Sequence, residues 1–130
     1  ALIETNGSGV LSFTNSPTLT TPIVTTLDMN GAIQELVYTA NVTGTYTLSA
    51  GNGTIQNITL TGDVSTVTDS LNDGEAITAV IDDGSGYEIS WGTTKWVGGS
   101  APTLDTTNKN VIVLWKVGSD LYGMLSGVAS

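Results

Sequence analysis

Paired carboxylates are the catalytic pattern that stands out in this sequence. Asp82, Asp83 and Glu88 lie close together along the chain, and Asp73 and Glu75 form a second group. Two carboxylates alone can hydrolyse a glycosidic bond. Both groups, however, include Asp-Gly turn sequences, in which aspartate bonds its own backbone and tolerates a left-handed conformation. We therefore predict that these carboxylates hold turns and that the protein is not an enzyme.

The same oxygens could in principle hold a calcium ion. The run from Asp82 to Glu88 lacks the spacing of a calcium loop, in which ligands recur at every second position. Histidine, cysteine and arginine are all absent from the 130 residues. Their absence removes the commonest general base, the thiolate ligands and the bidentate anion clamp. We predict neither a metal site nor a cofactor.

The charge balance restricts the classes of partner. The formal net charge is −9, with 12 acidic side chains against Lys95, Lys109 and Lys116. Affinity for nucleic acids depends mostly on cationic contacts to phosphates, so this chain should repel nucleic acids, and likewise anionic lipid surfaces. No run approaches the roughly 20 apolar residues that a membrane helix needs. We expect no nucleic-acid partner and no membrane partner.

Aromatic residues gather in the last third of the chain. Five of the eight are Tyr87, Trp91, Trp96, Trp115 and Tyr122. Such rings can form a platform for sugars, fill the core between two sheets, or lie in a protein interface. Trp91 and Trp115 are in phase with apolar neighbours, so we predict core positions for both. Trp96 follows Lys95 and precedes Gly98-Gly99 in a predicted loop, which makes it the better candidate for an exposed contact.

Alternation of apolar and polar residues predicts the strands that must position these side chains. The predicted strands cover residues 36–42, 46–48, 58–60, 76–81, 87–91, 111–117 and 121–125. Residues 111–117 are apolar at nearly every position, which is typical of a strand covered on both faces. Asn52-Gly53 predicts a hairpin, and Gly118-Ser-Asp120 predicts the last one. Residues 63–71 allow one helical turn at most, and no internal repeat is visible.

Short strands, frequent turns and the lack of a convincing helix predict an all-β fold. We expect an antiparallel β-sandwich or a jelly-roll-like barrel over residues 31–130. Residues 1–30 contain Pro17 and Pro22 and few clustered apolar residues, so they predict an extended N-terminal arm or an edge segment of the same domain. Charged residues make up only 12% of the chain. This low fraction indicates a surface partly hidden against other subunits, although a monomer coated with Thr and Ser is the alternative.

Several strings of residues resemble small β-domains in virion proteins of tailed bacteriophages. The strings are Leu71-x-Asp-Gly-Glu75, Ile81-Asp-Asp-Gly84, Ile89-x-Trp91, Lys95-Trp-x-Gly-Gly-x-Ala-Pro-Thr-Leu104 and Val111-Ile-Val-Leu-Trp115 to Tyr122-Gly123. The resemblance covers about residues 58–125. In that family such domains end tail fibres or stand alone in the virion, so the resemblance implies a β-sandwich domain of a virion.

The resemblance leads to two functional hypotheses. The chain begins at Ala1 without a secretory signal and lacks the long shaft of a fibre. We therefore expect a complete small protein that decorates or cements the capsid surface, binds the major capsid protein and forms a trimer or dimer. The alternative is a tail-fibre or receptor-binding module that recognises a host glycan beside tail-fibre partners. The candidate interface residues are Leu2, Ile3, Phe13, Ile23, Val24, Trp96 and Val97.

Overall fold

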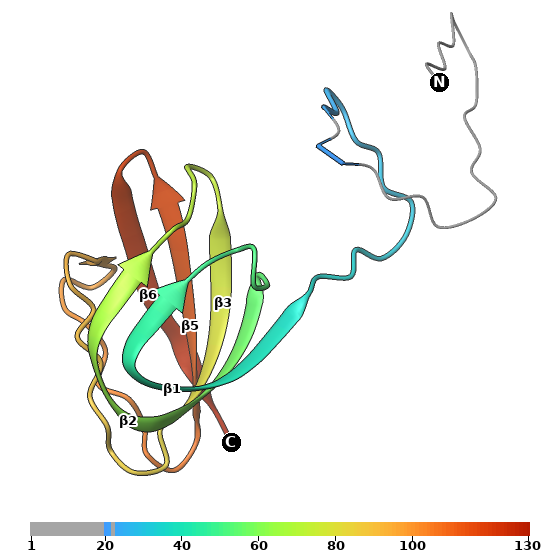
Figure 1. Ribbon diagram of the computed structural model, residues 1–130. Coiled ribbons are helices and arrows are strands. Elements are labelled where there is room, and N and C mark those ends of the chain that lie inside the picture. The colour runs from blue at the N-terminus through green and yellow to red at the C-terminus, as the bar shows by residue number, and fades with distance from the viewer. Residues whose placement is uncertain (1–19, 22) are drawn as a thin grey trace, which may run out of the picture. The chain divides into compact units, whose positions relative to one another are not determined.

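The structure is a computed structural model that describes residues 20, 21 and 23–130. The chain divides into two units, Ala1–Ile33 and Gln34–Ser130. All regular secondary structure in the described residues lies in the second unit and consists of strands (Figure 1). In this described part, no helix is present that could span a membrane. Three candidate interface residues, Leu2, Ile3 and Phe13, lie outside the described residues.

Six strands form one continuous sheet, which confirms the predicted all-β class. They are β1 (Val37–Leu48), β2 (Ile55–Asp69), β3 (Ala76–Asp82), β4 (Lys95–Trp96), β5 (Lys109–Val117) and β6 (Asp120–Ala129). Their order across the sheet is β1-β2-β3-β5-β6-β4. Only β3 with β5 and β5 with β6 run antiparallel, whereas the other three pairs run parallel. The sheet is therefore mixed, and the prediction of an antiparallel arrangement is wrong.

The parallel pairing of β1 with β2 arises because β1 curves back toward the start of β2. Parallel neighbours are normally joined by a crossover of a dozen residues or more, yet residues 49–54 alone join β1 to β2. The strand itself bridges the distance. Tyr38, near the start of β1, pairs with Gln56, and Tyr46, near its end, hydrogen-bonds to the same Gln56 side chain. Figure 1 shows the strong curvature of both strands.

The turn at Asn52-Gly53 shows how this curvature overturns a local prediction. The dipeptide predicts an antiparallel hairpin, and the chain does turn there, with Gly53 at a φ of 148°. A Cβ at Gly53 would lie 2.7 Å from the carbonyl oxygen of Leu36, so the position requires glycine. The flanking strands nevertheless run parallel, because β1 has already curved back before the turn begins.

Glycines allow β1 and β2 to bend. The pairing register shifts on both sides of Gly44, whose φ of 71° lies in the left-handed region. Bulges of this kind bend a strand and increase its twist. On β2, a Cβ at Gly62 would collide with the hydroxyl of Thr43. The second halves of both strands can therefore curve away from the first halves. In its second half, β2 also forms an isolated parallel bridge between Val64 and Ile89.

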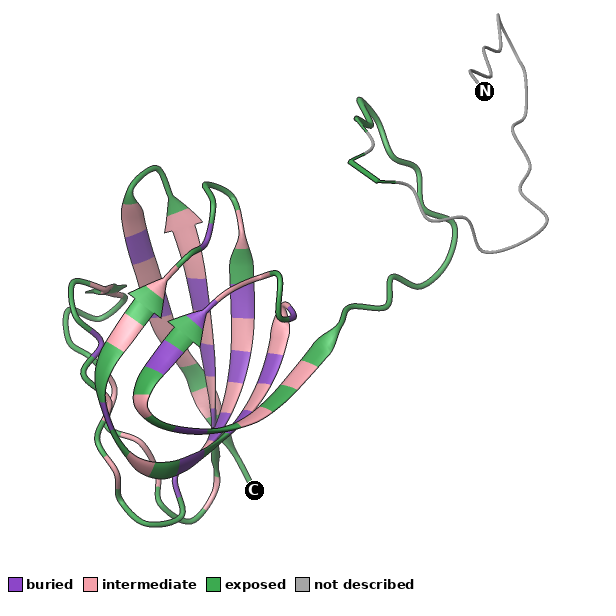
Figure 2. Ribbon diagram, in the orientation of Figure 1, coloured by how far each residue is buried: buried purple, intermediate pink, exposed green. Residues whose placement is uncertain are grey.

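The hydrophobic core draws on the curved-back halves of β1 and β2 and on alternate residues of β2, β3 and β5. Figure 2 shows the resulting alternation of buried and exposed bands along the strands. Burial of each large aliphatic side chain contributes roughly 1.5–3 kcal/mol. The largest fully buried apolar side chains are Tyr46, Leu48, Ile58, Val64, Ile77, Ile81, Ile112 and Leu114.

The strand predictions are confirmed except at Leu36 and residues 87–91. Residues 37–42 and 46–48 lie in β1, and residues 58–60 lie in β2. Residues 76–81, 111–117 and 121–125 lie in β3, β5 and β6, and the predicted turn after Val117 joins β5 to β6. Residues 63–69 extend β2 and form no helical turn. Residues 87–91 form no strand of their own, because Ile89 contributes only an isolated bridge.

A single buried amide ties the two ends of the curved strand together. The Tyr46 hydroxyl donates to Gln56 Oε1 at 2.7 Å, and Gln56 Nε2 donates to the carbonyl oxygens of Ser49 and Gly53 at 3.1 and 3.0 Å. Gln56 is fully buried, and no buried side-chain nitrogen or oxygen among the described residues lacks a partner. Burial, with a smaller repulsion from Tyr38, raises the pKa of Tyr46 far above its ordinary value. The hydroxyl therefore remains a donor.

Replacing Gln56 by leucine should lower the free energy of unfolding by about 2–4 kcal/mol, because the Tyr46 hydroxyl and two turn carbonyls lose their partners in a buried site. The Tyr46→Phe variant should lose about 1–2 kcal/mol. The double variant should lose less than the sum of the two, since both changes remove the same hydrogen bond. Urea unfolding followed by tryptophan fluorescence measures all three variants. Strictly additive losses would contradict the coupling.

Candidate functional site

Exposed apolar side chains concentrate in the segment that precedes the sheet. Ten large hydrophobic residues are exposed in the described part of the chain, and seven of them lie between residues 23 and 37. The seven are Ile23, Val24, Leu27, Met29, Ile33, Leu36 and Val37. Residues 23–36 form no strand or helix. Ile23 and Val24, two of the candidate interface residues, are 99% and 54% exposed, so both side chains are available to a partner.

Trp96 and Val97, the other described candidates, differ in exposure. Val97 is 62% exposed. The Trp96 ring is half-buried against the core and meets Trp91 edge-on, with ring centroids 5.1 Å apart and planes at 76°. It also covers Gly123, where an added Cβ would lie 2.8 Å from the Trp96 Cζ3 atom. Trp96 therefore takes part in packing, and Val97 is the more accessible of the two.

The Gly123→Ala variant should be destabilised by about 1–3 kcal/mol, because the added methyl group collides with the Trp96 ring in a packed site. Gly84→Ala is the matched control. Its added Cβ would meet its nearest neighbour, an Asp82 carboxylate oxygen, at 3.7 Å, an ordinary contact distance. Thermal unfolding and the tryptophan emission maximum should change in the first variant only. Equal effects of both substitutions would contradict the packing of Trp96 over Gly123.

Trp115 points away from the core, so its predicted core position is wrong. Burial alternates along β5, with Ile112 and Leu114 buried and Trp115 only half-buried on the opposite face. The Trp115 ring stacks on Tyr122 of β6, with centroids 5.9 Å apart and planes at 15°. Lys95 Nζ lies 5.8 Å from the centre of the Tyr122 ring. Residues 111–117 are apolar at nearly every position, so the sequence pattern could not identify the inward face.

Three of the five clustered carboxylates, Asp73, Glu75 and Asp83, accept backbone N–H groups at turns, as the sequence predicts. Asp83 accepts the backbone N–H of Tyr87 at 2.7 Å, and Asp73 accepts that of Gly118 at 2.8 Å. Glu75 accepts the backbone N–H three residues before it, also at 2.8 Å. Among the residues that the structure describes, no three acidic, histidine or cysteine side chains gather in a way that could hold a metal ion.

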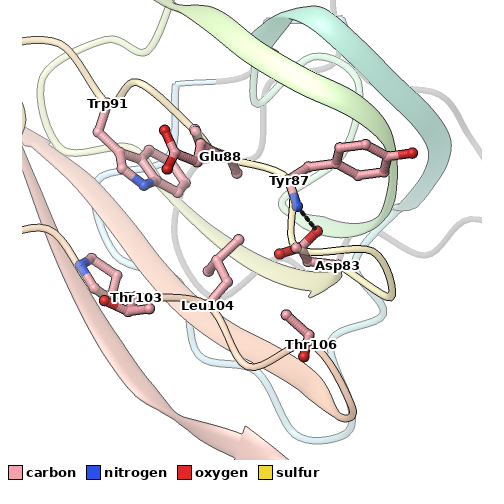
Figure 3. A pocket seen from close by; sticks show the side chains of 10 residues that line it. Asp83, Tyr87, Glu88, Trp91, Thr103, Leu104 and Thr106 are labelled. Atoms are coloured by element: carbon pink, nitrogen blue, oxygen red, sulfur yellow. Dashed lines mark hydrogen bonds between the residues drawn. The ribbon is translucent and has the colours of Figure 1, made fainter.

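A hollow of about 390 Å³ lies beside the Asp83 turn. Two segments line it and supply aromatic rings, carboxylates and hydroxyl groups. Its lining includes Asp83, Tyr87, Glu88, Trp91, Thr103, Leu104 and Thr106 (Figure 3). The charges on this lining are negative, so the hollow suits a neutral hydroxylated ligand better than an anion.

The loop on one side of this hollow is anchored by Asp105 and Asn110. The Asp105 carboxylate accepts the backbone N–H groups of Asn108 at 2.6 Å and Thr107 at 2.8 Å, and these two bonds lower the pKa of Asp105 below its ordinary value of 3.8. The buried Asn110 amide accepts from the backbone N–H of Asp105 at 2.7 Å and donates to the carbonyl oxygens of Asp105 and Ile81 at 3.0 and 3.3 Å. The loop is thereby fixed to the ends of β3 and β5.

Asp105 should make stability depend on pH at the acid end of the range. Because its pKa is lower in the folded state than in the unfolded state, the ionised carboxylate stabilises the fold above the unfolded value and loses this effect as the pH falls. Asp105→Asn should therefore be less stable than the parent protein at about pH 7, and the difference should shrink toward about pH 3. Urea unfolding across this range measures the difference. A difference that stays constant would contradict this role of Asp105.

Comparison of the chain with protein-family models, curated proteins and solved structures finds no match. The likeness to phage virion domains thus stays a prediction that rests on the residue strings themselves. These strings meet in the fold: Trp91 and Trp96 come from two of them and contact each other. The last string forms the β5–β6 hairpin, whose Gly123 lies beneath the Trp96 ring.

Proposed function

We propose that this chain is a non-enzymatic structural protein of a phage virion that decorates and stabilises the capsid. We base the proposal on the run of exposed apolar side chains from Ile23 to Val37. Contact of such side chains with water is unfavourable, and burial against a partner surface removes these side chains from water. The major capsid protein is the partner that we infer, since residues 58–125 resemble domains of tailed-phage virions.

Attachment through an extended segment suits a protein present in many copies. Such a segment loses conformational freedom when it binds, so each contact is weak for the area that it buries. Contacts that are linked in an oligomer act together, because the second binds at the high effective concentration that the first creates. We therefore infer that a dimer or trimer presents several arms to the capsid surface.

We further propose that residues 34–130 form a sandwich-like block. The curved-back halves of β1 and β2 share one core with the inward sides of β3 and β5, which supports a description in two layers. Layers about 10 Å apart would interdigitate their side chains. The jelly-roll alternative has less support, because β1, β2 and β3 pair in parallel.

The hollow beside Asp83 favours a second candidate function, the recognition of a host glycan by a tail-fibre or receptor-binding module. Ligand sites combine apolar and aromatic walls with a few polar groups that fix orientation, and Trp91, Thr103 and Glu88 supply both kinds. Trp96, the candidate for an exposed aromatic contact, packs over Gly123 and is only half-exposed. Glu88 is therefore the better probe of this alternative.

Removal of residues 1–30 should weaken attachment to purified phage capsids while the remaining residues stay folded. Full-length and truncated chains are mixed with capsids stripped of the protein, and bound protein is measured by co-sedimentation. We expect the apparent Kd of the truncated chain to rise at least about tenfold, equivalent to roughly 1.4 kcal/mol of lost contact energy. Far-ultraviolet circular dichroism checks the fold. Unchanged occupancy of the capsid by the truncated chain would overturn the role of the arm.

Matched variants distinguish the effect of the apolar side chains of the arm from the effect of shortening the chain. Replacing Ile23 and Leu27 by serine removes two exposed apolar side chains, whereas replacing Thr25 and Thr26 by serine changes only polar positions between them. The first variant should lose occupancy and the second should keep it. If both bind capsids as the parent does, and glycan binding is present and is abolished by Glu88→Ala, the second function replaces the first.

A further inference from the structure

A second apolar surface lies on the outward side of β3, β5 and β6, which we call the outer face. Side chains at alternate positions of these strands are exposed or half-exposed, while their neighbours are mostly buried. A sheet with one face in water normally places polar residues on that face. The pairing register instead arranges mostly apolar residues in three rows across the strands. The rows are Ala76–Trp115–Tyr122, Thr78–Val113–Met124 and Val80–Val111–Gly127.

The outer face is electrically balanced within a strongly acidic chain. Lys95 pairs in register with Tyr122 at one end of the face, and Lys109 begins β5 at the other end. Each end also has an aspartate. Asp120 forms an ion pair with Lys95 at 2.6 Å, and Asp82 ends β3 near Lys109. Two chains that each carry a net charge of −9 can therefore approach at this face with the least repulsion.

The two ends of the outer face differ in bulk, and this difference makes the face complementary to itself. The stacked rings of Trp115 and Tyr122 stand at one end. At the other end Gly127 pairs with Val111, and an added Cβ on Gly127 would meet nothing within 4 Å. A two-fold axis that crosses the strands over Val113 would place the bulky end of one copy on the open end of the other.

We propose that a second copy of this chain covers the outer face, so that the protein is a two-fold symmetric dimer with its sheets packed face to face. Sheets packed in this way lie about 10 Å apart and cross at a small angle. The two copies of Val113 then meet close to the axis, and the charged residues lie at the margin. An apolar centre with a polar rim is the usual anatomy of a protein interface. The dimer forms in solution and does not depend on capsid attachment.

Sedimentation equilibrium of the full chain tests the proposal. The parent protein should have the mass of two chains, and Val113→Glu should raise the dimer dissociation constant roughly 100-fold, because two like charges then face each other across the axis. Gly127→Leu fills the open end of the face and should also raise the dimer dissociation constant. Thr66→Glu places the same charge on an exposed residue of β2, outside the three strands of the face, and should leave the dimer unchanged. Near-ultraviolet circular dichroism confirms that each variant is folded.

Chemical cross-linking locates the interface independently of stability. The parent chain contains no cysteine, so a bismaleimide that spans the roughly 10 Å between facing sheets should cross-link two copies of the Val113→Cys variant but not two copies of the Thr66→Cys variant. A parent protein that sediments as a single chain, or a dimer that survives Val113→Glu in a folded protein, would overturn the proposal. So would a dimer that disappears when residues 1–30 are removed, because the arm would then form the interface. Capsid binding is measured separately, so either proposal can fail alone.

Discussion

The curvature of β1, held by the buried Gln56 side chain, is the constraint on which the rest of the structure depends. A straight strand of 12 residues would span about 40 Å, whereas the six residues 49–54 can span no more than about 22 Å. The chain could not then return to the start of β2. Because β1 curves back, Tyr46 reaches Gln56, and Gln56 in turn satisfies the carbonyl groups of the connecting turn. Parallel pairing of β1 with β2 follows from that geometry.

A few polar residues are buried in this fold, while large apolar residues lie on the outward side of the sheet. Gln56, Asn110 and Asp83 are buried, and each is held by hydrogen bonds to backbone groups. Burial of such groups is costly only when their hydrogen bonds are unmade. Meanwhile Trp115 and Val113 lie on the outward side of β5. The outward side of β5 therefore carries the apolar residues on which the proposed dimer rests.

The sequence predicted the class of the fold, but its long-range pairing lay beyond local patterns. Alternation identified the residues of β3, β5 and β6, and Asn52-Gly53 correctly marked a turn. The direction of the strands around that turn depends on a hydrogen bond between residues ten positions apart, Tyr46 and Gln56, which no local pattern reports. Val37, Ile55 and Thr78 lie side by side in this fold. The stretch of chain from Val37 to Ile55 is shorter than the stretch from Ile55 to Thr78, so this pairing leaves no sequence repeat.

The candidate site was predictable only in part, for a related reason. Exposure of Ile23 and Val24 follows from a segment that forms no regular structure. The phase of β5 is not predictable from the sequence, since a continuous apolar run fits either face, and the core position predicted for Trp115 is therefore wrong. A continuous apolar run is typical of a strand that is covered on both faces. Within its own unit, however, β5 is covered on one face only. If the second cover is another copy, the dimer also joins two arms. Each arm then binds at an effective concentration near the millimolar range, so even a contact too weak to hold one chain could hold two on a repeating surface.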